Sequence, residues 1–486
     1  MLWAVVIIPA AAALAAMAPP LRRLRAALLA GGALAHAGAV GWLCLAPPPA
    51  TAGAWLALDA PGRVILAVTS GLFLVVALYA VGYLRAERPA VRTDIQEGFL
   101  FRNEPEGVFV ACLLGFLATM SLVCVSSHLG LLWVAIEATT LVSAPLISFH
   151  RHHRSLEATW KYLLICSVGI ALALLGVFFL AAAAGDGAHG LTLDALLAAA
   201  GGMDPTLLKA AFIFLLVGYG TKMGLAPMHT WLPDAHSEAP SLVSALLSGA
   251  LLNCAFLGLL RGHAVLVAAH LGDFSGELLV LLGLVSMGAA AVFLIRQCDY
   301  KRMLAYSSIE HMGILALGVG LGGLAATGAM LHAVNHSLAK GLLFLTAGNL
   351  LAIYRTKTIG QVQGVLRRAP VNGALWLAGF FAIAGSPPFG LFISELTILK
   401  GAMDGGHWTV AVLYLLLLGM IFVAMARLVL PMAFGEAPQP SQPAREPAWA
   451  VAPPLVLGAG ALVLGLYVPG PLWNALADAA AAVGVH

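Results

Sequence analysis

The chain has 486 residues, of which 61% are hydrophobic and only 10% charged, and its net charge is +3. Soluble domains carry about 25% charged residues, so this composition excludes a soluble globular protein and indicates a polytopic membrane protein. The six cysteines are scattered without a C-x-x-C pair, and neither a G-x-G-x-x-G nor a Walker pattern occurs, so we predict no metal, iron–sulfur or nucleotide cofactor in this chain.

Fourteen stretches approach the length of about 20 largely apolar residues that a membrane-spanning helix needs. They lie at residues 2–18, 26–46, 63–84, 107–126, 129–148, 158–182, 207–227, 240–261, 276–295, 303–321, 325–351, 372–400, 408–432 and 449–469. The first stretch lacks the basic leading segment of a signal peptide, so we interpret it as a span. The predicted fold is therefore an all-α polytopic membrane protein with about 14 transmembrane helices.

Basic residues gather in the loops that follow spans one, three, five, nine and eleven, which share one side of the membrane if the spans alternate. Among them are Arg22, Arg23, Arg25, Arg85, Arg102, Arg151, Arg154, Arg296, Lys301, Arg302, Arg355, Lys357, Arg367 and Arg368. Short cytoplasmic loops are enriched in lysine and arginine. We therefore predict a multi-pass protein of the bacterial cytoplasmic (inner) membrane with both termini on the outer, periplasmic face.

Two spans of opposite orientation are interrupted in a similar way. Three glycines surround Lys222 in span seven and Pro227 follows, whereas span twelve carries GSPPFG at 385–390 and then Glu395. Paired broken segments in oppositely oriented halves are typical of inverted repeats with the functional site at the breaks. The predicted segments are 1–106 with helices 1–3, 107–262 and 276–432 as two inverted five-helix repeats, and 449–486 with helix 14 and a tail.

Span five and span seven each carry an ionisable residue inside an apolar run, Glu137 and Lys222. A lysine at bilayer depth costs on the order of 2.5 kcal/mol or more, and acids inside the membrane usually mark ion paths. We therefore predict that both residues belong to a proton path. The alternatives are a lysine that snorkels to the interface and a neutral, hydrogen-bonded structural glutamic acid.

Span eleven places His332, His336 and Lys340 one turn apart on a single helical face. Histidine titrates near neutrality, so this face resembles a proton relay. Zinc binding by the two histidines is the weaker interpretation, because no third ligand is evident and Lys340 would repel the metal. Glu395, beside the second break, corresponds to Lys222 in the proposed repeat and completes the predicted path.

Several further polar residues have two readings each. Glu310 and His311 lie just inside span ten, where Glu310 is either a buried proton station or an interfacial acid. Asn253 in span eight is predicted to be a hydrogen-bonding packer rather than a proton carrier. Lys161 either pairs locally with Glu157 at i, i+4 or feeds the proton axis.

The segment after the first break contains a dense polar cluster made of His229, Asp234, His236 and Glu238. This cluster is compatible with a metal loop. We favour a cytoplasmic site of proton uptake that also caps the following helix near Ser241.

Three longer motifs resemble a known family. They are KMGLAPMHTWLPDAHSEAP at 222–240, AYSSIEHMG at 305–313 and HSLAKGLLFL at 336–345. Together with Glu137 and Glu395 they are similar to the antiporter-like, proton-conducting membrane subunits of respiratory complex I, multi-subunit sodium/proton antiporters and membrane-bound nickel–iron hydrogenases. The resemblance extends from about Val108 to Pro431. The run at 155–176 is most similar to hydrogenase-4 component F.

The resemblance implies two inverted five-helix repeats with a charged axis. It implies that Glu137 and Lys222 are coupled, that Lys340 is the central lysine and that Glu395 is the outer gate. Many relatives carry a lysine in the eighth helix where Asn253 stands here, so the link between Lys222 and Lys340 would need water or histidines.

The predicted function is that of a proton-translocating subunit of a redox-driven complex of the hydrogenase-4, formate-hydrogenlyase or complex I type. This chain has no predicted catalytic or redox site, so its expected partners are other membrane subunits and, through them, a peripheral redox arm. One alternative is a subunit of a multi-subunit sodium/proton antiporter, or of another ion-coupled complex, without a redox partner. Another is a membrane anchor that has lost conduction.

Overall fold

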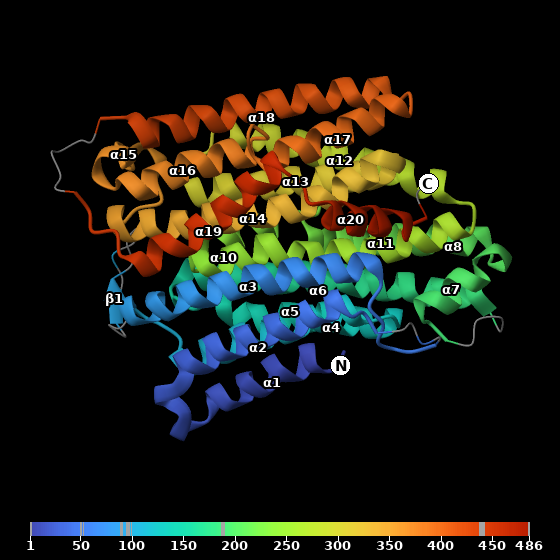
Figure 1. Ribbon diagram of the computed structural model, residues 1–486, viewed down its shortest axis with the longest axis horizontal. Helices are drawn as coiled ribbons and strands as arrows, with labels where there is room; N and C mark the ends of the chain where they lie inside the picture. Colours follow the sequence, from blue (N-terminus) through green and yellow to red (C-terminus); the bar gives the residue numbers. More distant parts are fainter. Residues whose placement is uncertain are drawn as a thin grey trace.

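The computed structural model describes residues 2–48, 51, 53–87, 91–93, 98, 100–185, 190–436 and 443–484. Long helices lie side by side in one bundle (Figure 1). Within the described residues, 12 helices are long and apolar enough to cross a membrane. They are η1 (Pro19–Leu24) with α2 (Arg25–Leu45), α3 (Ala60–Ala86), α4 (Glu106–Val125), α5 (Leu129–Ile147), α6 (His153–Ala184), α8 (Pro205–Met223), α10 (Ser241–Leu246) with η4 (Leu247–Leu251) and α11 (Leu252–Ala268), α12 (Gly272–Leu294), α13 (Tyr300–Leu321), α14 (Gly323–Tyr354), α18 (Trp408–Phe434) and α19 (Ala448–Leu466).

These helices coincide with predicted spans, so the prediction of an all-α bundle is confirmed. Two predicted spans are shorter than a full crossing. The first is α1 (Ala4–Met17), an apolar helix of 14 residues. The predicted span 372–400 is divided into α16 (Pro370–Ile383) and α17 (Gly390–Asp404), and the loop between them falls on the predicted break.

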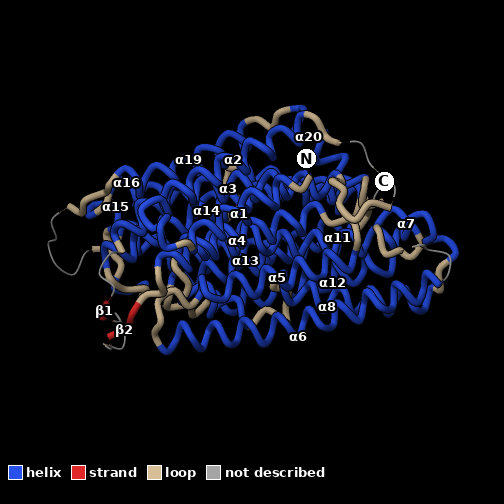
Figure 2. Tube along the Cα trace, turned by 90° about the horizontal axis from the view of Figure 1, so that it is seen from below, coloured by secondary structure: helices blue, strands red, loops and turns tan. Residues whose placement is uncertain are grey.

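The two ends of the bundle differ in their short elements (Figures 1 and 2). One end carries an antiparallel pair of strands, β1 (Val91–Thr93) and β2 (Leu100–Arg102), and the short helix α15 (Val365–Arg368). We call it the basic end because Arg151, Lys357 and Arg368 lie there. The opposite end carries α7 (Leu193–Ala199). Neither the strand pair nor α7 and α20 (Gly470–Ala481) was predicted, because such short elements leave no long apolar run.

The beginning of α1 and the end of α20 both lie toward the end opposite the basic one (Figure 1). The terminal residues Met1 and His486 lie outside the described residues. This arrangement agrees with the prediction that both chain ends share one side, which follows from an even number of crossings.

The first break follows α8, which runs toward the basic end. Gly224 ends the helix in the left-handed region (φ 86°), where a residue without a Cβ is favoured. The chain resumes as α9 (Trp231–Glu238), and the indole Nε1 of Trp231 donates a hydrogen bond of 2.8 Å to the carbonyl of Thr221. The break therefore leaves Lys222 at a helix terminus in the interior of the bundle.

The second break separates α16 from α17, which together run away from the basic end (Figure 1). α16 ends at Ile383, and Gly385 takes the left-handed conformation (φ 58°) before α17 begins at Gly390. The broken segment α8–α9 and the broken segment α16–α17 are thus antiparallel, and each one ends a helix with a glycine of positive φ.

A continuous helix of three parts, α10, η4 and α11, lies at the centre of the bundle. Every residue of its most apolar window is buried. The middle part, η4, is a π-helical turn at Leu247–Leu251. Such turns are uncommon and are found mostly at functional sites, because they open the regular hydrogen-bond ladder. Here the turn lies directly before Asn253.

Arg261 links α11 to the C-terminal end of α4. Its guanidinium binds both carboxylate oxygens of Asp59, at 2.9 and 2.8 Å, where Asp59 caps the start of α3. It also donates to the carbonyls of Val123, Cys124 and Ser126 at 2.7–3.2 Å, and these carbonyls end α4. The side chain is only 2% exposed. One arginine therefore satisfies polar groups at two helix termini.

Candidate functional site

Lys222 is completely buried at the last turn of α8. Its Nζ donates hydrogen bonds to the Thr140 hydroxyl at 2.8 Å and to the Tyr162 hydroxyl at 2.6 Å. The negative end of the α8 dipole also favours a cation at this position. Because both acceptors lie inside the bundle, the snorkelling alternative is wrong.

Glu137 and Lys222 meet through a threonine. The Thr140 hydroxyl, which accepts from Lys222, lies 3.3 Å from Oε2 of Glu137 and donates to it, and Ser167 donates to Oε1 at 2.8 Å. Glu137 itself is half-buried on the side of the bundle. The carboxylate and the ammonium are thus coupled by one hydroxyl group that serves as donor to one and acceptor from the other.

Tyr162 is a residue of this centre that sequence reasoning missed. Its ring lies 4.5 Å from Nζ of Lys222, and its hydroxyl also contacts Ser143 at 2.6 Å. A tyrosine in an apolar helix gives no sequence signal by itself. It becomes visible only when α5, α6 and α8 are packed together.

The threonine bridge leads to a first prediction. Replacing Thr140 by valine keeps the shape but removes the hydroxyl, and hydrogen bonds to charged groups contribute about 1.5–3 kcal/mol. For the proton transport that the sequence predicts, we expect the rate to fall about tenfold or more, measured in proteoliposomes with a pH-sensitive dye. Thr139→Val is the matched control, since the Thr139 hydroxyl bonds only the Ile136 carbonyl of its own helix. Equal rates in the two variants would contradict a role for the bridge.

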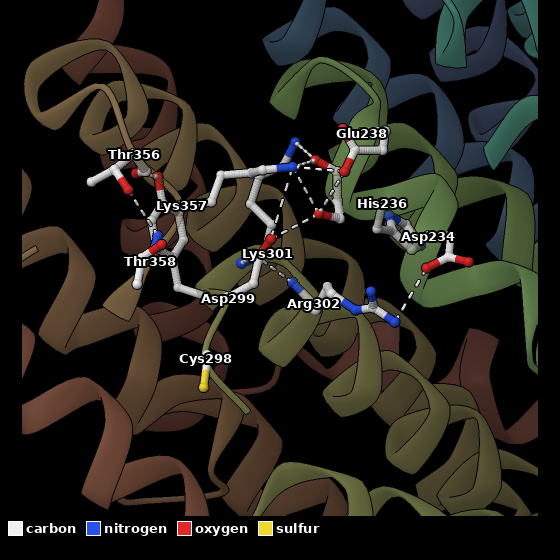
Figure 3. Close-up of polar contacts among 12 residues, drawn as sticks. Asp234, His236, Glu238, Cys298, Asp299, Lys301, Arg302, Thr356, Lys357 and Thr358 are labelled. Carbon is white, nitrogen blue, oxygen red and sulfur yellow. Dashed lines mark hydrogen bonds and ion pairs between the residues drawn. The ribbon is translucent and has the colours of Figure 1, made fainter. Parts of the chain in front are cut away.

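The basic end of the site is an ion-pair network around the end of α9 (Figure 3). Lys357 donates to Glu238 at 2.8 Å and to the Ser237 hydroxyl at 3.0 Å. Lys301 donates to the Ser237 carbonyl at 3.0 Å, so it caps the C-terminus of α9. Burial raises the pKa of Glu238, but the charge and hydrogen bond of Lys357, together with the nearby charges of Arg154 and Lys301, leave that pKa below its usual range. This network fixes the end of the first broken segment.

The four polar residues after the first break contact different partners and do not form a common metal site. They are His229, Asp234, His236 and Glu238. Asp234 pairs with Lys161 at 3.1 Å and with Arg302 at 3.2 Å. His236 is buried and stacks on Phe344, with 5.1 Å between ring centroids. Lys161 also contacts Glu157 at 2.7 Å and is exposed, so the structure places it in a surface ion-pair cluster.

His229 lies in the loop of the first break and is largely buried. Its ring lies 6.0 Å from the ring of Phe293, measured between centroids. No described residue forms a hydrogen bond with its Nδ1. The structure therefore separates His229 from the ion pairs of Asp234 and Glu238.

A cavity of about 770 Å³ with charged and polar side chains among its lining residues opens at the basic end beside this network. Its walls come from α3, α9, α13, α14 and α19, and they include Tyr79, Glu238, Lys301, Asn349, Lys357 and Trp449. The cavity brings the surface of the basic end next to Glu238 and Ser241.

Small polar side chains link the central helix to the second half of the bundle. The Asn253 amide donates to the Ser337 hydroxyl at 2.9 Å and to the Gly249 carbonyl at 3.1 Å. Ser248 of the π-helical turn meets Ser308 of α13 at 2.8 Å. Asn253 therefore packs against α14 between His336 and Lys340, and its Oδ1 has no partner among the described residues.

Lys340 is completely buried in the middle of α14. Its Nζ donates to the Leu304 carbonyl at 2.7 Å and to the Ser307 hydroxyl at 2.9 Å, both on α13. His336, one turn earlier, is buried with neither ring nitrogen bonded to a described residue. The predicted shared face of α14 thus points at α13.

Beyond Lys340 the site ends in a group of three buried residues from three helices. Nδ1 of His311 lies 2.9 Å from Nε2 of His332, and one donor atom from each of these histidines and Glu395 lies within 4.8 Å of the others. Glu310 is also buried, with its Oε2 4.0 Å from Nε2 of His311. Glu310 is therefore a buried residue, and its role as a proton station stays a prediction.

Asn335 is a second residue that the sequence did not suggest. Its side chain is fully buried, and neither amide atom has a hydrogen-bond partner among the described residues. It packs over Gly390, where an added Cβ would lie 2.3 Å from its Oδ1. Asn335 thus presents a polar group to the start of α17, close to the second break.

A bundle of apolar helices with two broken segments and a buried row of lysines, histidines and glutamates defines an antiporter-like membrane protein. Residues 126–421 match the transmembrane family described as "NADH:quinone oxidoreductase/Mrp antiporter, TM". The chain belongs to this family and is a multi-pass integral membrane protein, as the sequence motifs predicted.

Individual relatives agree with this assignment. The chain is 37% identical over 422 residues to a hydrogenase-4 component F homolog of Methylacidiphilum infernorum, covering 85% of each chain. A chain of the membrane-bound sulfane sulfur reductase, an archaeal respiratory complex, shares the fold with a TM-score of 0.87 at 22% identity, covering 99% of this chain and 97% of that one. A chain of respiratory complex I from Thermus thermophilus is 26% identical with a TM-score of 0.77, covering 98% and 99%.

Proposed function

We propose that the protein is a proton-translocating subunit of a redox-driven membrane complex. The observation that carries the proposal is the row of buried ionisable groups, from Lys222 through Lys340 to Glu395, in an otherwise apolar bundle. Such groups are expensive inside a membrane and usually mark ion paths. Here they come from both broken segments and from α14 between them.

The proposed route begins at the cavity of the basic end and passes His236 to Lys222. The Thr140 bridge lets Glu137 set the charge of Lys222, because a nearby carboxylate favours the ammonium form. The proton then crosses beside Asn253 to Lys340. The crossing needs water, which the unbonded nitrogens of His236 and His336 would hold. From Lys340 the route follows His336, His332 and His311 to Glu395.

We further propose 14 membrane crossings with two inverted five-helix repeats, residues 107–262 and 276–432. In this scheme α1 and the pair α16–α17 each complete one crossing. The antiparallel directions of the two broken segments support the scheme, as does the glycine of positive φ in each break. The basic end is then cytoplasmic by the positive-inside rule, in the inner membrane of a bacterium.

The expected partners are other membrane subunits and a peripheral redox arm. The similarity to a hydrogenase-4 component F homolog and to chains of respiratory complexes supports this proposal. We propose no cofactor or catalytic centre in this chain, so the energy for transport comes from the partners. The second candidate is a subunit of a sodium/proton antiporter, which the match to a chain of the Mrp complex of a Dietzia species favours (TM-score 0.82, 20% identity).

A reconstitution experiment tests the proposal. The complex purified with its partners is placed in proteoliposomes, and acidification is measured on adding electron donor. We expect acidification without sodium, and we expect Glu137→Gln combined with Lys340→Ala to abolish it. Acidification that requires sodium would favour the antiporter, and unchanged acidification in the double variant would make the chain a non-conducting anchor.

A further inference from the structure

We propose that His311, His332 and Glu395 form a binding site for a divalent transition metal of the zinc class. The inference has a second part, which rests on the proposed function: a bound metal blocks the last part of the proton route. The site joins α13, α14 and α17, so it lies where the second broken segment meets the histidine face.

The donor atoms are of the right kind and are close together. One atom from each residue lies within 4.8 Å of the other two, and Nδ1 of His311 lies 2.9 Å from Nε2 of His332. Ligands of a tetrahedral zinc ion are separated by about 3.3 Å, given bonds of about 2.0–2.1 Å. Small rotations of the side chains would bring the three atoms to that spacing. Two imidazoles and one carboxylate favour zinc, cobalt or nickel over magnesium or calcium.

One imidazole has a hydrogen-bond partner on its outer nitrogen, and the other faces a carboxylate beyond hydrogen-bond distance. Nδ1 of His332, which faces away from His311, lies 3.0 Å from the Ser394 hydroxyl. Nε2 of His311 lies 4.0 Å from Oε2 of Glu310. Histidines that bind metals almost always donate their other N–H to a carboxylate, a backbone carbonyl or water, which fixes the tautomer and the ring direction. The Ser394 hydroxyl can accept such a hydrogen bond from His332, and a small shift of Glu310 would bring its carboxylate to His311.

A second observation points to a missing ligand. Glu395 is 7% exposed, and no described residue forms a hydrogen bond with its Oε1. Its carboxylate lies against Gly385, where an added Cβ would come within 1.8 Å of Oε2. The glycine thus makes room for the carboxylate beside the two rings. A buried carboxylate oxygen without a donor costs free energy, and a cation between it and the imidazoles would remove that cost.

Lys340 does not occupy the site, although its charge argued against a metal at the sequence level. Its Nζ donates to Leu304 and Ser307, which precede His311 on α13 by about two turns and one turn. Lys340 lies on α14 together with the proposed ligand His332, but its amine donates to other acceptors. A third ligand, whose absence weakened the zinc interpretation, is supplied by α17.

Occupation of the site would stop proton transfer for a simple reason. A histidine nitrogen that binds a metal has no free lone pair for a proton, and the positive charge of the metal disfavours protonation of the bound carboxylate. His311, His332 and Glu395 would then cease to serve as proton carriers together. Lys222 and the Thr140 bridge would remain unoccupied, so the block is local to the second half.

The binding test uses the complex purified with its partner subunits and titrated with Co²⁺, whose visible d–d bands report tetrahedral coordination. We expect one ion per chain at this site, displaced by Zn²⁺. His311→Gln, His332→Gln and Glu395→Gln should each remove the bands or weaken binding by more than the about 10-fold to 100-fold that loss of an outer-shell partner costs. His263→Gln is the matched control, because His263 is a buried histidine that bonds Ser275 far from the site.

His332→Cys keeps the result interpretable if the glutamine variants fail to fold. A thiolate is also a zinc-class ligand, so this variant should retain binding and add a sulfur-to-cobalt charge-transfer band. Bands that persist unchanged in all three glutamine variants would overturn the proposed site, as would the lack of stoichiometric binding in the wild type.

The transport arm is read separately. Zn²⁺ should inhibit acidification over the same concentration range in which it displaces Co²⁺. Stoichiometric binding without inhibition would overturn the proposed block. If the wild type does not transport protons at all, the proposed function fails, while the cobalt spectra still decide whether the metal site exists.

Discussion

Replacing Lys222 by alanine is expected to abolish coupled proton transport while the complex still assembles. The Lys222 ammonium group donates a hydrogen bond to the hydroxyls of Thr140 and Tyr162. When it is removed, Thr140 keeps its hydrogen bond to Glu137 and Tyr162 keeps its contact with Ser143. Loss of a positioned proton carrier typically lowers a rate by about 100-fold or more. Because Thr140 and Tyr162 each keep a hydrogen-bond partner, the amount of assembled complex should stay close to that of the wild type.

The measurement compares dye-monitored acidification with the electron-transfer rate of the same preparation. Lys209→Ala is the matched control, since Lys209 lies on the same helix but is exposed. We expect it to retain transport. Transport retained in Lys222→Ala would refute the proposed route, whereas loss of assembly would show that Lys222 is structural.

Replacing Arg261 by alanine is expected to have the largest effect on stability. The change strands Asp59 and three carbonyls at the end of α4, all of which bind the guanidinium. Breaking a buried ion pair by removing one partner costs on the order of 3 kcal/mol. We therefore expect a lower midpoint of thermal unfolding in detergent and less folded protein in the membrane.

Arg261→Lys separates charge from geometry. A lysine keeps the positive charge but cannot bind a carboxylate in a bidentate manner and three carbonyls at once. We expect it to recover less than half of the lost stability. Full recovery would mean that charge alone matters, and an unchanged midpoint in Arg261→Ala would contradict the role of Arg261 at the two helix ends.

The helices were predictable because a helix that crosses a membrane requires a long apolar run in the sequence. The same run marks both breaks, since glycine and proline interrupt it at 224–227 and 385–388. The strand pair, α7 and α20 were not predictable by this reasoning. The two strands pair with each other, α7 packs against α11, and α20 packs against α3 and α14. The sequence pattern of a few residues does not record such contacts.

The ionisable residues of the site were visible in the sequence for a related reason, namely that charge stands out in an apolar helix. The hydroxyl groups that connect them were not visible. Thr140 and Tyr162 are ordinary residues for such helices, and only packing of α5, α6 and α8 gives them their role. The third ligand beside His311 and His332 was hidden in the same way, because Glu395 lies more than 60 positions later in the chain.

Asn253 and the serines around it give the proposed route a particular electrical character. An amide or a hydroxyl reorients and passes hydrogen bonds along, but at neutral pH it does not store a charge. Lys222 and Lys340 then each hold a proton separately, and the residues between them hold no charge. A proton is either on one side or the other, so the crossing becomes a gated hop that depends on transient hydration. The serine-lined π-helical turn beside Asn253 is the natural place for that hydration to be switched on and off.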